Sequence, residues 1–375
     1  MKTDKKQRVL VAMSGGVDSS VAALLMKKKG YEVLGVFMKN WSDTKNEIGE
    51  CKWKDERKMA VKIASKLNIP LITLDFEKEY RRDVVEKMFE NYRKGITPNP
   101  DIDCNQKVKF PLLIKTAKKL KADYVVTGHY ARIKRKEGGC ELLRAKDESK
   151  DQSYFLYRIN RNELKNSLFP IGDYTKKQVR DIARKNSFPN FDKKSTVGIC
   201  FIGKINLKKF LQKKIRPKKG KILDPNGNII GEHDGIYYYT IGQRIGSRFG
   251  IEIAKEKLNK KRFERWYVAR KNLKKNEIVA APKNHSLNFR KEIIIKKFHL
   301  IYGDKKQFIK SISKKPKKVL SRIRQVGELL PSRIYFEKNK FKITLNKAIT
   351  GVSMGQAIVL YEGKKTLGGG VINFE

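Results

Sequence analysis

The stretch Val9-Leu-Val-Ala-Met-Ser-Gly-Gly-Val-Asp-Ser-Ser20 decides the fold of the first half of this 375-residue chain. It reads as a short buried strand, a glycine-rich turn and the start of an apolar helix. Such a turn presents backbone N–H groups and the positive end of the helix dipole, which together bind phosphate oxygens. It is neither the Gly-x-x-x-x-Gly-Lys-Ser/Thr loop nor the Gly-x-Gly-x-x-Gly fingerprint. We therefore predict a phosphate-binding loop of another type, in which serine hydroxyls add donors and Asp18 positions a metal-bridged phosphate.

Outward from this loop, short apolar runs alternate with amphipathic stretches. The runs that we predict as buried strands are Arg8–Met13, Tyr31–Met38, Pro70–Phe76 and Ala122–Thr127. The predicted helices lie near Ser19–Lys29, Trp53–Leu67, Glu77–Lys94 and Val108–Leu120. Strands and helices in alternation imply right-handed βαβ units and a parallel sheet. Residues 1–204 are therefore predicted to form an α/β domain.

Beyond residue 270 the pattern changes to strand-like runs separated by turn residues. These runs are Glu277–Ala281, Glu292–Phe298, Phe341–Leu345 and Gln356–Tyr361. They predict an all-β domain, a small β-barrel, over residues 271–375. Residues 205–270 bridge the two parts and contain a basic stretch and the turn Asp224-Pro225-Asn226-Gly227. We predict that this piece forms a small central domain.

The net charge points to a polyanionic partner. The chain has 86 Lys and Arg against 39 Asp and Glu, a formal charge of +47, and so basic a surface attracts nucleic acid ahead of anionic membranes. The charge is denser after residue 204, with +28 over residues 205–375 and +19 over residues 1–204. No run approaches the ~20 apolar residues that span a bilayer, and the N-terminal apolar stretch is too short for a signal peptide. We expect a cytoplasmic protein that does not enter membranes.

Two of the four cysteines stand in stretches that predict loops. Cys104 lies in the proline-rich stretch Thr97–Asn105, and Cys200 lies between two glycines. A single cysteine is most often a small buried hydrophobe, and we keep that interpretation for Cys51 and Cys140. A loop position suits solvent-accessible thiol chemistry for the other two. The spacing of cysteines and histidines argues against structural zinc, and nothing local suggests an iron–sulfur cluster.

The glycine-rich loop resembles the Ser-Gly-Gly-x-Asp-Ser motif of the PP-loop ATP pyrophosphatases, in the same strand-loop-helix context. The resemblance implies a catalytic domain like that of the adenine nucleotide alpha hydrolases. It also implies cleavage of ATP to AMP and pyrophosphate, with adenylation of an oxygen of the substrate. A carbonyl oxygen leaves poorly, and adenylation lets it depart as AMP.

A longer, ordered set of motifs resembles the tRNA-specific 2-thiouridylases, which place sulfur on C2 of the wobble uridine, and this likeness covers nearly the whole chain. In the first half its markers are Ala12-Met-Ser-Gly-Gly-Val-Asp-Ser19, Gly35-Val-Phe-Met-Lys-Asn-Trp41, Thr97-Pro-Asn-Pro-Asp101, Cys104-Asn-Gln-Lys-Val-Lys-Phe110, Thr127-Gly-His-Tyr130 and Lys150-Asp-Gln-Ser-Tyr-Phe-Leu156. Later markers are Gly198-Ile-Cys-Phe-Ile-Gly203, Thr240-Ile-Gly-Gln-Arg244 and Gly368-Gly-Gly370.

This resemblance implies a role for each matching residue. The ATP phosphates would lie against Ala12, Met13, Ser14, Gly15, Gly16, Val17, Asp18 and Ser19, with Mg²⁺ between the phosphates and Asp18. Met38 and Gly128 would contact the nucleotide. Asn99, Pro100 and Asp101 would lie against the target base, with Asp101 as an acid/base or positioning group. Contacts to tRNA would come from His129, Lys150, Asp151, Gln152, Arg324, Gln325 and Gln356, although from the residues alone His129 is favoured as a structural histidine.

The same resemblance implies the sulfur chemistry. Cys200 would carry a persulfide delivered by a sulfur donor, which is either a cysteine desulfurase or a relay protein. Cys104 would be the resolving thiol and would pass through a transient Cys104–Cys200 disulfide. A thiolate is the useful form of the resolving thiol, and basic surroundings favour it. The implied substrate is tRNA that reads Lys, Glu or Gln codons, whose wobble base leaves the anticodon stack.

One position departs from the family pattern. The family has Arg followed by an aromatic residue where this chain has Arg324 and Gln325. Arg324 keeps the basic contact to tRNA, but Gln325 cannot stack on a base as an aromatic residue does. Most of the lysine-rich run Phe308–Lys318 is predicted to be a solvated face.

Two other functions stay open at the level of the residues. A PP-loop enzyme could insert nitrogen rather than sulfur into tRNA, a reaction that does not need two loop cysteines. The chain could also be an RNA-binding protein whose ATP loop is only regulatory. The sequence leaves the oligomeric state open, with a monomer as the expectation.

Overall fold

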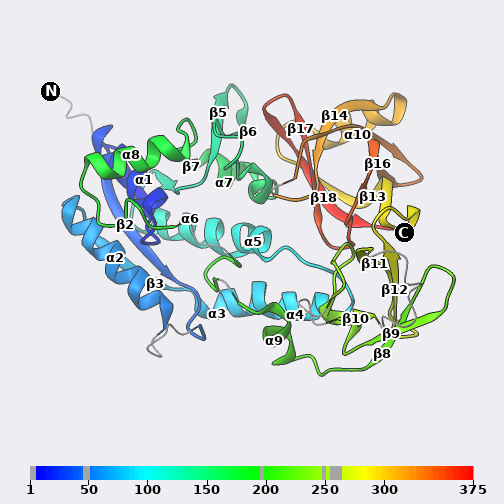
Figure 1. The fold of residues 1–375 in the computed structure, drawn as a ribbon. Helices are drawn as coiled ribbons and strands as arrows, with labels where there is room; N and C mark the ends of the chain where they lie inside the picture. Colours follow the sequence, from blue (N-terminus) through cyan, green and yellow to red (C-terminus); the bar gives the residue numbers. More distant parts are fainter. Residues whose placement is uncertain are drawn as a thin grey trace.

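The computed structural model of the chain describes residues 6–44, 51–194, 198–203, 205–246, 251–253, 264–325 and 327–374, whose strands form three sheets (Figure 1). The first sheet has the order β3-β2-β1-β4-β7 and is parallel throughout. Its strands are β1 (Arg8–Ala12), β2 (Glu32–Lys39), β3 (Leu71–Asp75), β4 (Tyr124–Val126) and β7 (Ser167–Leu168). The predicted α/β fold and its four predicted strands are confirmed.

Helices cover both faces of this sheet, because successive strand residues point to opposite sides. Val9 and Val11 of β1 share a core with three helices, whereas Leu10 belongs to the core on the other face. The helices on the first face are α1 (Val17–Lys28), α2 (Lys52–Lys66) and α8 (Lys176–Lys185). On the second face lie α6 (Phe110–Lys119) and the run of α3 (Glu77–Tyr80), the π-helix η1 (Arg81–Glu86) and α4 (Lys87–Arg93).

The second sheet shares a hydrophobic core with the α3–α4 side of the first domain, next to α9 (Leu207–Gln212). Its strands are β8 (Gly220–Leu223), β9 (Ile229–His233), β10 (Glu252–Ile253), β11 (Trp266–Asn272) and β12 (Glu277–Pro282). The predicted turn joins β8 to β9, with the Asp224 N–H donating to the Asn228 carbonyl at 2.9 Å. Strand β12, which we expected in the C-terminal β-barrel, pairs in parallel with β8 instead. By its pairing, β12 belongs to the second sheet. The domain division at residue 270 stays a prediction.

The third sheet closes on itself as the predicted C-terminal β-barrel, because β13 pairs with both β16 and β18. Its strands are β13 (Phe289–Leu300), β14 (Lys317–Arg322), β15 (Leu330–Glu337), β16 (Lys340–Thr350), β17 (Ala357–Glu362) and β18 (Lys365–Asn373), with α10 (Lys305–Lys314) between β13 and β14. A hairpin from the first half, β5 (Ala131–Lys136) and β6 (Gly139–Arg144), extends this sheet through a pairing of Leu143 with Lys365.

Buried polar contacts fasten the β-barrel to the first domain. Asp151 is fully buried and its carboxylate lies 2.8 Å from the guanidinium of Arg322 on β14, which is also buried. The Thr97 hydroxyl is 3.2 Å from that of Thr240, and the Thr97 N–H donates to the Met354 carbonyl at 3.0 Å. The segment that leads into Asn99–Asp101 therefore touches both the connection between β9 and β10 and the connection between β16 and β17.

Within the described ranges, none of the helices has the length and apolar character that crossing a bilayer requires.

Candidate functional site

The glycine-rich loop between β1 and α1 is held in one shape by hydrogen bonds. The Ser19 hydroxyl donates to the Gly16 carbonyl at 3.0 Å and accepts from the Ser14 N–H at 3.2 Å. The side-chain amide of Asn190 donates to the Gly15 carbonyl at 3.1 Å. These contacts occupy carbonyls of the loop, while the N–H groups of Gly15 and Gly16 donate to no described residue. The loop therefore keeps two backbone donors available, as phosphate binding requires.

Close packing at two glycines explains why the loop tolerates no side chain there. Gly15 has a φ of +72°, and a Cβ on it would lie 2.3 Å from the Glu56 carbonyl oxygen. A Cβ on Gly128, just beyond β4, would lie 2.8 Å from the backbone nitrogen of Ser19. Met38 is buried near the end of β2, the strand that pairs with β1. The residues expected to contact ATP thus gather at the carboxyl edge of the parallel sheet, where ligands of open α/β sheets bind.

Asp18 does not have the free carboxylate that we expected for Mg²⁺. Its two oxygens accept the Lys176 ammonium at 2.7 and 2.8 Å, and one also accepts the Tyr130 hydroxyl at 2.8 Å. A metal ion would have to displace this ammonium, so Asp18 does not fit as a direct ligand in this arrangement. No group of three or more His, Cys, Asp or Glu side chains in the described residues could hold a metal ion.

The structure brings Cys104 and Cys200 together as free thiols, close enough for each to shift the pKa of the other. The prediction that Cys104 stands on an accessible loop is wrong. Cys104 begins the π-helix η2 (Cys104–Lys109) and is fully buried. Pro100 occupies the first turn of α5 (Pro100–Asp103), where its missing N–H costs nothing, and Asn99 caps this helix. The prolines therefore start a helix, whereas Cys200 does lie in a turn and is half-buried.

The two thiols differ in how easily they lose their proton. The hydrogen bond from Cys104 lowers the pKa of the Cys200 thiol, and the nearby Lys109 ammonium adds to this effect. Burial raises the pKa of the Cys104 thiol well above its usual range, and the neighbouring Cys200 raises it further. Of the two thiols Cys200 is therefore the easier to ionise, which reverses our expectation that the resolving thiol Cys104 would be the thiolate.

The turn that carries Cys200 is fixed from both sides. The Cys200 N–H donates to the Asp101 carboxylate at 2.8 Å, and the Tyr80 hydroxyl donates to the Cys200 carbonyl. Burial raises the pKa of the Asp101 carboxyl, which this N–H partly offsets. In this arrangement Asp101 positions the Cys200 turn, and its role as an acid or base stays a prediction.

Glu56 connects the cysteine pair to the glycine-rich loop. Its carbonyl oxygen packs against Gly15, and its carboxylate is close enough to Cys200 to influence the pKa of that thiol. The phosphate-binding loop and the two sulfurs therefore belong to one site, formed at the carboxyl edge of the first sheet.

Several residues expected to contact tRNA meet at the junction with the C-terminal β-barrel. The Gln325 amide donates to the Asp151 carbonyl across 174 residues of sequence. The Gln152 side chain accepts from the Tyr130 N–H at 2.9 Å. Asp151 itself is buried against Arg322, so its carboxylate serves this junction, and only its neighbour Lys150 is exposed.

Three other expected contacts lie in different surroundings. Arg324 is exposed and donates to the Gly351 carbonyl at 2.7 Å, and the Gln356 side chain accepts from the Ser353 N–H at 3.3 Å. His129 is buried, with its ring 5.9 Å from that of Phe110 and 5.9 Å from that of Phe169. Burial lowers the pKa of His129 well below its usual range. Its packing fits the structural interpretation, and its contact with tRNA stays a prediction.

Four polar residues of the site were missed by sequence reasoning. They are Asn40, Tyr80, Lys109 and Lys176. Asn40 and Lys109 lie inside motifs quoted above. Asn40 follows the strand β2 and Lys109 follows Cys104 by five residues, and these places in the motifs could have identified them as site residues. Asn40 is almost fully buried, and neither atom of its amide has a hydrogen-bond partner. Such an orphaned group is costly unless a ligand satisfies it, which fits a binding site at this edge of the sheet.

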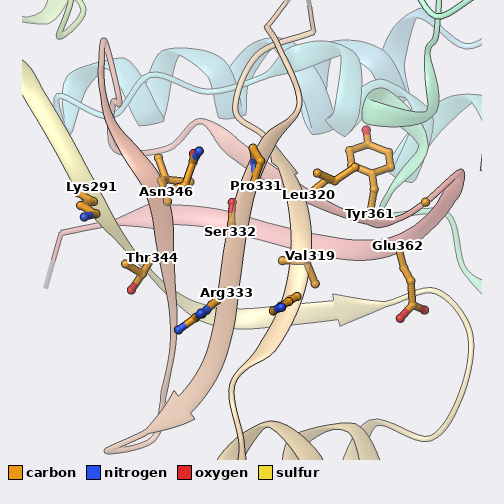
Figure 2. Close-up of a pocket in the computed structure, with 13 residues that line it drawn as sticks. Lys291, Val319, Leu320, Pro331, Ser332, Arg333, Thr344, Asn346, Tyr361 and Glu362 are labelled. Atoms are coloured by element: carbon orange, nitrogen blue, oxygen red, sulfur yellow. The ribbon is translucent and has the colours of Figure 1, made fainter.

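A basic hollow of about 600 Å³ lies on the C-terminal β-barrel (Figure 2). Lys318 on β14 pairs directly with Arg333 on β15, which pairs with Thr344 on β16, and Lys291 lines the same hollow. Like charges directly opposite one another across a sheet destabilise it. An anion between these cations would relieve the repulsion.

Comparison with known proteins covers the chain in three parts. The family model described as "tRNA methyl transferase HUP domain" matches residues 7–204. The model described as "tRNA methyl transferase PRC-barrel domain" matches residues 208–282, and "Aminomethyltransferase beta-barrel domain" matches residues 290–372.

Whole-length relatives agree with one another. The tRNA-specific 2-thiouridylase MnmA of Lactobacillus helveticus is 39% identical over 100% of this chain and 97% of its own length. MnmA 1 of Geobacillus kaustophilus is 41% identical over 98% of this chain and 96% of its own length. MnmA of Buchnera aphidicola is 41% identical over 98% of this chain and 97% of its own length. A solved 4-thiouridine synthetase in complex with RNA and ATP has a TM-score of only 0.37 at 14% identity, over 53% of this chain and 46% of that one, a likeness too low to inform the site.

Proposed function

This chain belongs to the family of tRNA-specific 2-thiouridylases, and from that premise we propose that it replaces the C2 oxygen of the wobble uridine of tRNA with sulfur, at the expense of ATP. The observation that carries the proposal is the pair of free thiols, Cys104 and Cys200, beside the phosphate-binding loop. The tRNAs would be those that read Lys, Glu and Gln codons.

The first step is adenylation of the base. The wobble uridine leaves the anticodon stack, which costs a few kcal/mol and less for an unpaired loop base. Its C2 oxygen attacks the α-phosphorus of ATP, a P–O bond forms and pyrophosphate leaves. The loop N–H groups of Gly15 and Gly16, together with the dipole of α1, stabilise the charge on the phosphates. Mg²⁺, when present, would arrive with the phosphates of ATP and neutralise part of their charge.

The second step transfers sulfur. A donor persulfide charges Cys200, and the terminal sulfur of the Cys200 persulfide attacks C2, so that the C–O bond breaks and AMP leaves. Cys104 then loses its proton and attacks the Cys200 sulfur. The S–S bond to the base breaks, a Cys104–Cys200 disulfide forms, and the thiocarbonyl stays on C2. A dithiol reductant restores the two thiols. The closeness of the two free thiols supports formation of this disulfide.

The proposed activity has a direct test. The purified protein is incubated with unmodified tRNA, ATP, Mg²⁺ and a cysteine desulfurase with cysteine as the persulfide source. We expect thiolated tRNA, seen as a retarded band in a mercury-affinity gel, and one AMP for each sulfur transferred. Absence of sulfur from tRNA reading Lys, Glu and Gln codons would refute the proposal. If the protein then binds RNA without producing AMP and pyrophosphate, it would be an RNA-binding protein whose ATP loop is only regulatory.

The charge of the chain predicts strongly salt-dependent tRNA binding. We propose that the hollow lined by Lys291, Lys318 and Arg333 contacts tRNA phosphates, which would relieve the repulsion within it. Each phosphate contact should lower log affinity by roughly 0.7 to 0.9 per log unit of salt. Filter binding between about 50 and 200 mM salt measures the slope, and Lys318→Met should reduce it by about one contact. A flat salt response would contradict this role of the charge.

A further inference from the structure

Lys109 is a cation whose polar partner is a sulfur. Its ammonium lies 3.8 Å from the Cys200 Sγ and 5.6 Å from the centre of the Phe201 ring. Among the described residues it forms no ion pair with a carboxylate, although most lysines near this site do. The Cys200 sulfur is therefore the polar group that the Lys109 ammonium contacts.

The π-helix η2 explains how this contact arises. Cys104 is its first residue and Lys109 its last, and both side chains reach Cys200. Five residues apart, they would lie on different sides of a regular α-helix, which has about 3.6 residues per turn. The wider turn of a π-helix, a feature frequent at functional sites, brings both groups to the same sulfur.

We propose that Lys109 is the counter-ion that holds the Cys200 sulfur as an anion, and that it thereby makes Cys200, rather than Cys104, the cysteine that accepts sulfur. The charge on Cys200 can be measured without tRNA, whereas the statement about sulfur acceptance rests on the proposed function. Lys109 lies inside the motif Cys104–Phe110, but neither the residues nor the resemblance gave it a role.

The chemistry follows from where the charge lies. An opposite charge at about 4 Å favours the ionised form of a thiol. The Cys200 thiolate attacks the outer sulfur of a donor persulfide, the donor S–S bond breaks, and the donor thiol leaves with the proton. The product is a Cys200 persulfide anion, and the Lys109 ammonium balances this charge as well. The Cys104 thiol keeps its proton and donates a hydrogen bond to the same sulfur until it is needed for resolution.

The test measures the reactivity of Cys200 in the full chain. Reduced wild-type protein and the Lys109→Met variant are alkylated with iodoacetamide from pH 5.5 to pH 10, and each cysteine peptide is quantified by mass spectrometry. Because the pKa of the Cys200 thiol is lowered in the wild type, its alkylation rate should rise at a lower pH than that of an ordinary thiol. In Lys109→Met the rise should move to higher pH by about one unit or more, with about a tenfold slower rate at pH 7.

Matched variants separate charge from folding. Lys107→Met removes a lysine of the same π-helix that pairs with Asp103 at 3.7 Å and should leave the Cys200 profile unchanged. Lys109→Arg keeps the charge and should stay close to the wild type, and Cys51 serves as the internal reference thiol. If Lys109→Met melts early in circular dichroism, Lys109→Gln takes its place. An unchanged Cys200 profile in folded variants would overturn the inference.

The two proposals fail separately. A shifted alkylation profile in a protein that never thiolates tRNA would leave the charge on Cys200 established and refute the proposed function. A thiolating protein in which Lys109→Met retains both the profile and the selectivity for Cys200 as persulfide carrier would refute the role of Lys109 alone.

Discussion

Replacing Cys200 with serine should abolish thiolation of tRNA, by at least roughly 10³-fold, because the hydroxyl cannot carry a transferable sulfur. Binding of tRNA and ATP should persist, since the Cys200 side chain lies beside the phosphate-binding loop without forming it. The Cys200 turn is held through its backbone N–H and carbonyl, to Asp101 and Tyr80, and serine keeps both bonds. The measurement is initial rate of sulfur incorporation by mercury-affinity gel, with ATP binding by calorimetry.

The control for this variant is Cys51→Ser, which changes a half-buried cysteine at the start of α2 and should retain activity. Cys104→Ser should stop within one turnover with tRNA held on Cys200 through a disulfide, because no thiol remains to resolve that S–S bond. Full activity of Cys200→Ser would contradict the sulfur mechanism and favour a nitrogen-inserting enzyme, which does not need these cysteines.

Replacing Gly15 with alanine should weaken ATP binding by roughly 10²-fold, because a loop moved by about 1 Å loses its alignment with the phosphates. The added Cβ would lie 2.3 Å from the Glu56 carbonyl oxygen, on a residue with a φ of +72°. The backbone of Glu56 cannot yield as the end of a side chain would, so the loop itself must move. Calorimetry with ATP and the ATP dependence of AMP release measure the loss.

The matched control is Gly30→Ala, since Gly30 has a φ of +86° and no atom within 4 Å of the added Cβ. It should cost the same backbone strain of about 1 kcal/mol and leave ATP binding unchanged. Equal ATP affinity in Gly15→Ala and wild type would show that this loop does not hold the phosphates.

Much of the architecture could be predicted from local patterns. The apolar run before Ser14 and the glycines after it indicated a strand, a turn and a helix, because hydrophobic period and glycine content act within a few residues. The parallel sheet and the C-terminal β-barrel followed for the same reason. Strand β12 was placed with the wrong neighbours, because its pattern defines a strand but not which strand it pairs with.

The site was predicted in its parts but not in its contacts. Asn99 and Pro100 read as breakers of regular structure, yet together they start the helix that leads to Cys104. Asp18 was expected to face a metal, and Lys176, far away in the chain, takes that place. The sequence shows that residue 18 is a carboxylate, but not that Lys176 is its partner.

The sequence by itself determined which chemical groups are present, where strands and helices run, and that the chain belongs with enzymes that modify tRNA. Only the tertiary structure decided which of the two thiols ionises more easily, because that depends on burial of Cys104 and on the distance from Lys109 to Cys200. Propensity and period act between neighbours in sequence. Hydrogen bonds, charge pairs and desolvation act between neighbours in space, and these are set when distant segments pack together.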